Sequence, residues 1–392
     1  MPEEPDEIPP DILSRIPLFR EMSRILSSGE GPINWELARQ AAVAVAASGE
    51  DGSGEIPGDP AAVAAGYQEP LRLAELWLAD TSTLAAVSPL GVHPVSRTDW
   101  VESIIPGFRP LADPLAARVV DGISGIELVN EQVRPALTTF VSVLFGMQVG
   151  TALGHLARAV LAQYDLGLPA ADPHHLVPVE ANIAAFVREY EIDPLEFRIW
   201  LAGHELMHDR VLDGVPWMRG YLQGLVARFA RGMQADPAQL SQQLGSLDPA
   251  NPASLQEALA NPEILNMLRT PEQDAALEQL ETTLSLVQGY VDLGLETGLA
   301  TRLPSSSRIA EAMRRRRAEK GPGEQIFEQL VGLDLTAAVY REGLAFCRAV
   351  VQAQDIEGLD RIWALPDNLP TAGEMDDPPR WLIRMELARA GG

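Results

Sequence analysis

The residues with the clearest chemical potential are His204, Glu205 and His208, which form the pattern His-Glu-x-x-His at positions 204–208. Side chains four positions apart lie one turn apart on the same face of an α-helix. The two histidines can therefore offer two imidazole nitrogens to one zinc ion, with Glu205 beside them as a base for zinc-bound water. The alternative is a pair of ordinary histidines on a helix. With only 6 histidines in 392 residues, chance gives this pattern in roughly one such chain in a hundred.

The residues around this motif predict a helix over about 194–213. Asp193 can cap its N-terminus, Pro194 suits the first helical position, and Glu196 suits the acidic position of a capping box. Gly214 is typical of the residue that follows a helix end. The motif is therefore expected within a regular helix, as the shared-face geometry requires.

A third zinc ligand is expected on a second helix, predicted over about 271–297. Catalytic zinc commonly takes three protein ligands and leaves one position for water. In zincins of the glutamate type the third ligand is a glutamate, and an aspartate one turn later can orient a zinc-binding imidazole. The corresponding residues here are Gln288 and Asp292. Glutamine ligates only through a neutral carbonyl oxygen, so zinc is expected to bind weakly at Gln288 or to be absent.

Further residues are candidates for supporting roles at this site. Tyr290 and Tyr340 are possible hydrogen-bond donors to the oxyanion of a hydrolytic transition state. Glu281, Glu296 and Glu342 are further candidates for the missing ligand, although Glu281 lies two turns before position 288. The sequence alone leaves these alternatives open.

Composition excludes several classes of function. The formal net charge of −25 argues against nucleic acid or a membrane surface as partner. The single cysteine, Cys347, excludes an intramolecular disulfide. The acidic N-terminus has no apolar secretory segment, so a cytoplasmic location is expected. The basic run 314–317 predicts a solvated helix face or a lid over acidic surface. His174 and His175 are adjacent and do not share a helix face, so they are expected in an exposed loop.

One segment resembles a membrane span in its composition. No charged residue occurs between Arg134 and Arg158, and Gly146, Gly150 and Gly154 stand four positions apart. Polar side chains interrupt the segment, and the neighbouring segments are amphipathic. We expect a central buried helix whose small residues allow close helix approach.

The whole chain is predicted to be mainly α, with at most a small edge of β structure near 176–179. A boundary near residue 90 divides a predicted N-terminal helical region, 1–90, from a domain over 91–392 that contains the motif. Residues 235–270 are predicted as a long loop. Helices are expected at about 11–28, 34–48, 60–80, 113–130, 133–164, 194–213, 217–234, 271–297, 306–320, 324–332, 335–353 and 377–390, with a further segment near 98–106.

From about Trp100 to its C-terminus the chain resembles the zincin-like metallopeptidases, some of which are labelled as hydrolases associated with deazaflavin-coenzyme biosynthesis. Besides the motif, the resemblance rests on Gly146-Met147-Gln148-Val149-Gly150, Ala162-Gln163-Tyr164-Asp165-Leu166, Asn182-Ile183-Ala184-Ala185-Phe186, Val215-Pro216-Trp217-Met218-Arg219, Tyr340-Arg341-Glu342-Gly343 and Leu369-Pro370-Thr371.

The resemblance implies a multi-helix zincin-like fold and zinc-dependent hydrolysis of a peptide or protein substrate. Members tend to carry Leu-Glu-Gly-x-x-Asp on the second helix, where this chain has Val-Gln-Gly-Tyr-Val-Asp at 287–292. We therefore expect a zinc metallopeptidase in which Glu205 activates water. The alternative is a catalytically weakened binding or scaffold protein, because Gln288 replaces the expected glutamate.

Overall fold

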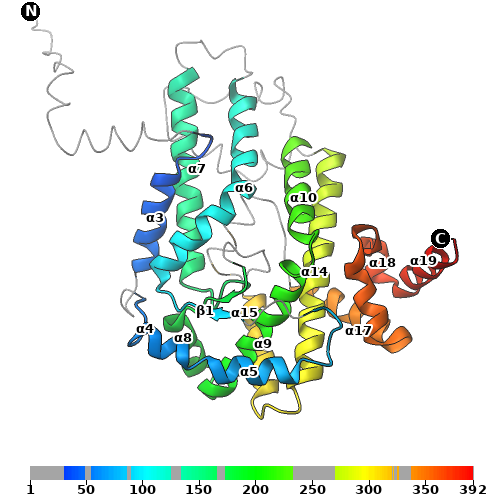
Figure 1. The fold of residues 1–392 in the computed structure, drawn as a ribbon. Helices are drawn as coiled ribbons and strands as arrows, with labels where there is room; N and C mark the ends of the chain where they lie inside the picture. The colour runs from blue at the N-terminus through cyan, green and yellow to red at the C-terminus, as the bar shows by residue number, and fades with distance from the viewer. Residues whose placement is uncertain are drawn as a thin grey trace, which may run out of the picture.

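The protein is mainly α-helical, as the sequence predicts (Figure 1). The computed structural model describes residues 31–48, 54–85, 90–124, 134–165, 173–232, 270–319, 321, 325 and 337–391. The helix predicted at 11–28, nearly all of the loop predicted at 235–270, and all but one residue of the helix predicted at 324–332 lie outside these described residues.

The described helices are α3 (Trp35–Ala47), α4 (Pro60–Ala65), α5 (Gln68–Trp77), α6 (Arg97–Ser124), α7 (Arg134–Ala157), α8 (Glu180–Glu189), α9 (Pro194–Leu212), α10 (Met218–Gly232), α14 (Pro271–Leu299), α15 (Ser306–Ala318), α17 (Ala337–Asp360), α18 (Ala372–Asp376) and α19 (Pro378–Gly391). Two short strands, β1 (Gly91–Val92) and β2 (His175–Leu176), pair in parallel with Gly91 opposite His175. They are the β structure of the described part of the chain, so the prediction of a small β edge is confirmed.

Two elements differ from the sequence-based expectation. Helix α6 is one continuous helix where separate segments near 98–106 and 113–130 were expected. Its prolines at 106, 110 and 114 are spaced by four, so they share one helix face, and the lost hydrogen bonds bend the helix rather than end it (Figure 1). Helix α8 was not predicted. Its N-cap, Val179, makes no side-chain capping bond, so the usual sequence signal is missing.

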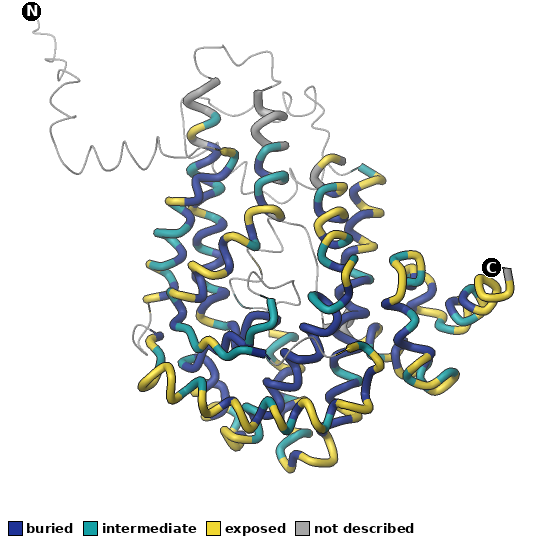
Figure 2. Tube along the Cα trace, viewed as in Figure 1, coloured by how far each residue is buried: buried dark blue, intermediate teal, exposed yellow. Residues whose placement is uncertain are grey.

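The buried side chains form two clusters. One joins α3, α6 and α7, which lie together in Figure 1, and the other surrounds α9, α10, α14 and α17. The burial view shows α9 dark over nearly its whole length, whereas much of α19 is exposed (Figure 2). Tyr67 and Leu78 belong to the second cluster and Trp35 to the first. The boundary near residue 90 stays a prediction, and both clusters draw residues from either side of it.

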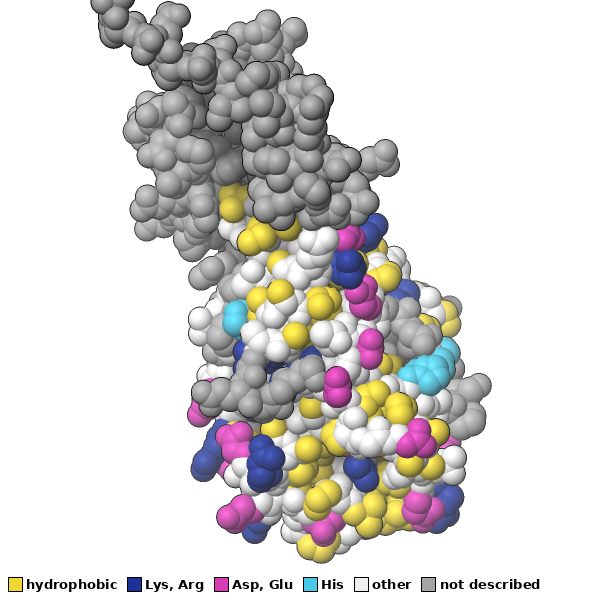
Figure 3. All heavy atoms as spheres, turned by 90° about the vertical axis from the view of Figure 1, so that its left-hand side faces the viewer, with side chains coloured by type: hydrophobic (Ala, Val, Ile, Leu, Met, Phe, Trp, Pro, Cys, Tyr) yellow, Lys and Arg dark blue, Asp and Glu magenta, His cyan; other side chains and the backbone are white. Residues whose placement is uncertain are grey.

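Acidic and basic side chains are interspersed on the face that carries α3 (Figure 3). Arg39 on this helix pairs with Glu36 and with Glu102 of α6, each at 2.9 Å. Such exposed pairs contribute little stability, typically below about 1 kcal/mol. The strong negative charge of the sequence is thus partly offset locally on this face.

Helix α7 is the segment whose composition resembled a membrane span. Its glycines pack against α3: a Cβ atom on Gly146 would lie 2.6 Å from the carbonyl oxygen of Asn34, and one on Gly150 would overlap that of Ala38. The small residues therefore serve close helix approach, as predicted. Within the described residues, no helix is both long and apolar enough to cross a membrane.

This close approach predicts that Gly150→Ala destabilises the fold by about 1–3 kcal/mol, because the added methyl group has no space against α3. Gly220→Ala on α10 is the matched control, since a Cβ atom there meets no atom within 4 Å. The control is expected to be neutral or slightly stabilising. Urea unfolding of both variants measures the difference, and equal stabilities would contradict the packing argument.

Candidate metal centre

The motif helix α9 begins and ends close to where the sequence predicts. The carboxylate of Asp193 accepts hydrogen bonds from the backbone N–H groups of Leu195 (2.9 Å) and Glu196 (3.0 Å), and Pro194 occupies the first turn. The expected capping-box role of Glu196 is not what the structure shows. Its carboxylate instead accepts the N–H of Ser305 at 2.6 Å and so ties α9 to the start of α15.

The imidazoles of His204 and His208 lie next to each other on the buried face of α9. Their ring centroids are 4.3 Å apart, and the two side chains are only 2% and 0% exposed. The Nδ1–H of His208 donates to the carbonyl oxygen of His204 at 3.0 Å, which leaves the lone pair on Nε2. This Nε2 atom is buried and has no hydrogen-bond partner among the described residues.

Both imidazoles are held in the neutral form that binds metals. Burial is the main cause of a pKa for His208 lowered to about 4, and the nearby positive charge of Arg317 adds to the effect. Burial also lowers the pKa of His204 well below its usual value, followed by the charges of His208, Arg317 and Arg316. A neutral imidazole keeps a lone pair at neutral pH, so both rings are ready to act as ligands.

Glu205 of α9 is fully buried against the segment that follows α7. Its Oε1 lies 3.1 Å from Nδ1 of His204, and its Oε2 accepts the N–H of Tyr164 at 3.4 Å. Burial raises the pKa of this carboxyl well above its usual range, and the negative charge of Asp165 raises it further. A carboxyl with a raised pKa is suited to exchange protons near neutral pH.

The second helix, α14, packs against α9 in the opposite direction. Gly203 faces Leu295 and Leu299, whereas Gly294 faces Met207. This register puts Asp292 close to the level of His208 and Gln288 about one turn beyond it. At the start of α14, Thr270 and Gln273 form a capping box, and the helix begins where the sequence predicts.

Gln288 and Asp292 contact each other across one turn of α14. The Nε2 group of Gln288 donates to Oδ1 of Asp292 at 2.9 Å, and the Asp292 Oδ2 atom accepts from Arg317 at 3.0 Å. The amide oxygen of Gln288 consequently faces away from that carboxylate. Asp292 was expected to orient an imidazole, but in this structure the Nδ1 atom of His208 is held by the carbonyl oxygen of His204.

The predicted oxyanion donors lie as follows. The hydroxyl of Tyr290 donates to Oδ1 of Asp360 and lies 2.6 Å from Oγ of Ser82, and its ring packs edge-on against Trp363. The Tyr290 hydroxyl is therefore engaged by Asp360 and Ser82 in this structure. Tyr340 is in the first turn of α17, and its side chain lies outside the described residues. Of the alternative ligands, Glu296 pairs with Arg348 at 2.5 Å.

The basic run 314–317 was predicted as a solvated face or as a lid over acidic groups, and α15 combines the two. Arg314 and Arg315 pair with Glu311 at the surface. Arg316 and Arg317 point inward, and each pairs with a carboxylate beside the site, Asp165 at 2.6 Å and Asp292 at 3.0 Å. Two ion pairs therefore tie α15 to the segment that follows α7 and to α14.

The ion pair of Asp165 predicts a large loss of stability in Asp165→Asn. Burial alone would raise the pKa of Asp165, but the charge and hydrogen bonds of Arg316 and the N–H of Leu161 outweigh it and lower the pKa. The carboxylate therefore stabilises the fold at any pH above its unfolded pKa of about 4. This contribution is lost as the pH falls through the folded pKa, which is lower. We expect a loss of about 2–3 kcal/mol at pH 7.

Urea unfolding at pH 7 and at progressively lower pH measures this effect. Asp377→Asn is the control, because its pair with Arg380 is exposed and 3.7 Å long. The control should change stability by less than about 0.5 kcal/mol. A loss in Asp165→Asn that stays constant down to acidic pH would contradict the assigned role of the carboxylate.

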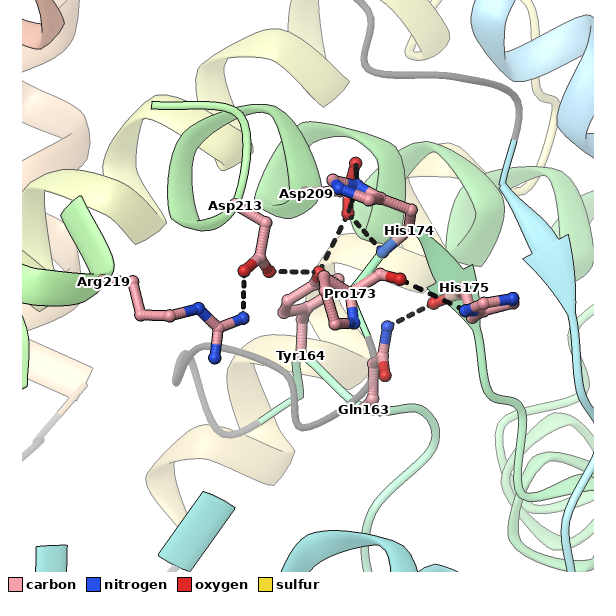
Figure 4. Close-up of polar contacts among 8 residues, drawn as sticks. All are labelled: Gln163, Tyr164, Pro173, His174, His175, Asp209, Asp213 and Arg219. Carbon is pink, nitrogen blue, oxygen red and sulfur yellow. Dashed lines mark hydrogen bonds and ion pairs between the residues drawn. The ribbon is translucent and has the colours of Figure 1, made fainter. Parts of the chain in front are cut away.

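A polar network on α9 holds His174, the residue that precedes β2 (Figure 4). Asp209 accepts hydrogen bonds from the hydroxyl of Tyr164 (3.0 Å) and from the N–H of His174 (3.0 Å), and the Nδ1 atom of His174 lies 3.1 Å away. Tyr164 also donates to Asp213, which pairs with Arg219. The network holds Tyr164 close to Glu205.

The predicted description of the two loop histidines as exposed needs a correction. The side chain of His174 is 36% exposed and is engaged by Asp209, while the ring of His175 stacks on His93 with centroids 4.3 Å apart. Both are partly buried because His175 belongs to β2 and His174 precedes it, and β2 pairs with β1, which is far away in the sequence.

The donor set fits a zinc ion at its two imidazoles. The Nε2 atom of His208 is a buried acceptor without a hydrogen-bond partner among the described residues, and leaving such an atom unpaired costs stability. A bound metal ion would satisfy its lone pair. Among the described residues, no group of three or more His, Cys, Asp and Glu side chains is placed to hold a metal ion. Within this described part of the chain, a third protein donor would have to be of another type, and the amide oxygen of Gln288 is the candidate that the sequence predicted.

Comparison with known proteins identifies the family. A family model of zincin-like metallopeptidases matches residues 33–382. The chain belongs to the zincin-like metallopeptidase family. No curated protein matches the chain. Among solved structures, the chain is similar to a protein from Chloroflexus aurantiacus described as a candidate hydrolase with a novel fold, with 27% identity, a TM-score of 0.65, and coverage of 90% of this chain and 99% of that chain.

The zincin-like match begins earlier than the resemblance that started near Trp100, so it includes α3, α4 and α5. Sequence reasoning also missed the roles of Arg316 and Arg317 at the site. Their partners lie 151 and 25 residues away in the chain, so the sequence around the run does not identify those partners. The helical period could have distinguished the surface arginines from the inward ones. Arg314 and Arg315 lie three and four residues after Glu311, and both pair with it.

Proposed function

We propose that this zincin-like protein is a zinc-dependent hydrolase that cleaves peptide bonds, with Glu205 as the base that accepts a proton from water. The observation that carries the proposal is the buried Nε2 of His208, which has no partner among the described residues and lies beside a second neutral imidazole. Family membership and the similarity to a candidate hydrolase support it.

His204 and His208 would hold the metal, with the amide oxygen of Gln288 as a weak third donor. Zinc supplies a Lewis acid that lowers the pKa of a water molecule and polarises a carbonyl group. The remaining steps belong to the chain itself. Glu205, with its raised pKa, accepts the proton of the attacking water and passes it to the leaving amine.

The surroundings of these residues favour such proton transfer. His204 and Glu205 are almost completely excluded from solvent, and electrostatic interactions are stronger in such a site than in water. Tyr164 contributes its backbone N–H to the carboxylate of Glu205, which limits the positions that the carboxylate can adopt. Peptides are the proposed substrates because the family is one of metallopeptidases.

The test is cleavage of a mixed peptide library by the purified chain. We expect cleavage in the presence of zinc, loss of at least about 100-fold after chelation, and recovery on adding zinc back. Metal analysis of the same samples gives the zinc content. Activity that survives complete removal of metal, or a zinc-loaded protein that cleaves no peptide, would overturn the proposal.

One observation favours a second function, that of a catalytically weakened binding protein. Gln288 lacks the carboxylate charge that stabilises zinc, and its amide is already bonded to Asp292, which in turn is paired with Arg317. A chain that stays free of metal at micromolar zinc and cleaves no peptide would support this alternative.

A further inference from the structure

A pocket of about 420 Å³ lies between α9, α14, α15 and α17. Trp200 of α9 lines this pocket, and its ring stacks on His204 with centroids 5.2 Å apart. Asp292 and Arg317 line it as well, and both charges act on the imidazole of His208. These three lining residues therefore connect the pocket to the candidate metal centre, although neither imidazole lines it.

The inner and outer parts of the pocket differ in polarity. The buried lining residues are apolar: Trp200, Leu295, Leu299 and Met313 are each less than 9% exposed. Exposed residues mark the opening, and most of them are polar: Glu296, Ser307 and Arg314, with Ala310 between them. A ligand group that enters from solvent thus passes a polar rim and reaches an apolar interior.

The charged residues of the lining do not favour a charged ligand. The carboxylate of Asp292 and the guanidinium of Arg317 are paired at 3.0 Å, so either sign of ligand charge would compete with an existing ion pair. An apolar side chain leaves that pair intact and displaces water from apolar walls. The volume lies within the range of small-molecule sites.

From this arrangement we propose that the pocket binds a large apolar side chain of the peptide substrate, such as leucine or phenylalanine, next to the bond that is cleaved. This inference rests on the proposed function for its substrate class. It makes Trp200, Met313 and the residues at the opening of the pocket specificity-determining, whereas the chemistry stays with Glu205 and the imidazoles.

The experiment measures binding separately from cleavage. Full-length Glu205→Gln protein with zinc is titrated by calorimetry with blocked peptides that differ at one scanned position, carrying Leu, Phe, Ala, Glu or Lys. The Leu and Phe peptides should bind about 10- to 100-fold more tightly than the Glu and Lys peptides. Ala310→Trp and Ser307→Trp, made separately in the same background, fill the opening and should abolish this preference.

Ala318→Trp is the matched control, because it adds the same side chain to an exposed position on α15 that does not line the pocket. The control should keep the preference, and thermal melting checks that all three variants are folded. Equal affinity across the peptide series, no binding at all, or a preference that survives in both pocket variants would overturn the inference.

The two proposals fail in distinguishable ways. Apolar peptides that bind through the pocket but are not cleaved by the zinc-loaded parent chain would refute the hydrolase and leave the binding pocket standing. Cleavage by the parent with a preference that neither pocket variant changes would refute the pocket and leave the hydrolase standing.

Discussion

Glu205→Gln is expected to lower kcat for peptide cleavage by about 100- to 10,000-fold while the protein keeps its zinc. The amide has nearly the shape of the carboxyl but cannot accept a proton from water. Since the imidazoles of His204 and His208 are untouched, zinc content and peptide binding should stay within about twofold of the parent values. Steady-state kinetics and metal analysis of the same preparation measure both quantities.

Glu180→Gln provides a matched control, because Glu180 is also a buried carboxylate, 5% exposed, and lies on α8 with Arg198 as its partner. This variant is expected to lose stability but not kcat. If Glu205→Gln retained more than about a tenth of the parent kcat, Glu205 would not be the base.

The same substitution has a consequence for the stability of the metal-free protein. The folded pKa of Glu205 is raised above the unfolded value, so the folded state holds this proton more tightly than the unfolded state does. The carboxyl therefore destabilises the fold increasingly as the pH rises from its unfolded pKa of about 4.3 towards its folded pKa. Metal-free Glu205→Gln should melt at a higher temperature than the metal-free parent, by a margin that grows as the pH rises above the unfolded pKa.

The features that could be predicted from the sequence are those that depend on residues close together in the chain. Asp193 and Thr270 cap their helices through bonds to residues two or three positions away, so the starts of α9 and α14 could be predicted. The two imidazoles share a face because their spacing is four. By contrast, Val179 gives α8 no such signal, and α8 was missed.

The remainder of the site depends on contacts between distant segments. Glu205 meets Tyr164, which is 41 residues earlier, and Arg316 meets Asp165, which is 151 residues earlier. Neither contact has a local pattern. Asp292 illustrates the limit: it was expected to orient an imidazole, whereas only the structure reveals that Gln288 and Arg317 donate to its two oxygens.

Gln288→Glu is expected to increase zinc affinity at least about tenfold, because a carboxylate at this position offsets the charge of the ion where the amide does not. Without zinc the same variant should lose about 1–2 kcal/mol of stability. The bond from Nε2 of Gln288 to Asp292 is then replaced by two adjacent carboxylates. Zinc titration and thermal melting with and without zinc measure the two effects.

Gln279→Glu is the control, since it adds the same charge at an exposed position of the same helix and should leave zinc affinity unchanged. An affinity that Gln288→Glu does not alter would show that position 288 does not contribute to the metal centre. If both zinc binding and cleavage appear only in Gln288→Glu, the natural chain is a weakened member of its family. If the parent already binds zinc and cleaves, two imidazoles and a neutral third donor suffice, and the hydrolase proposal gains its strongest support.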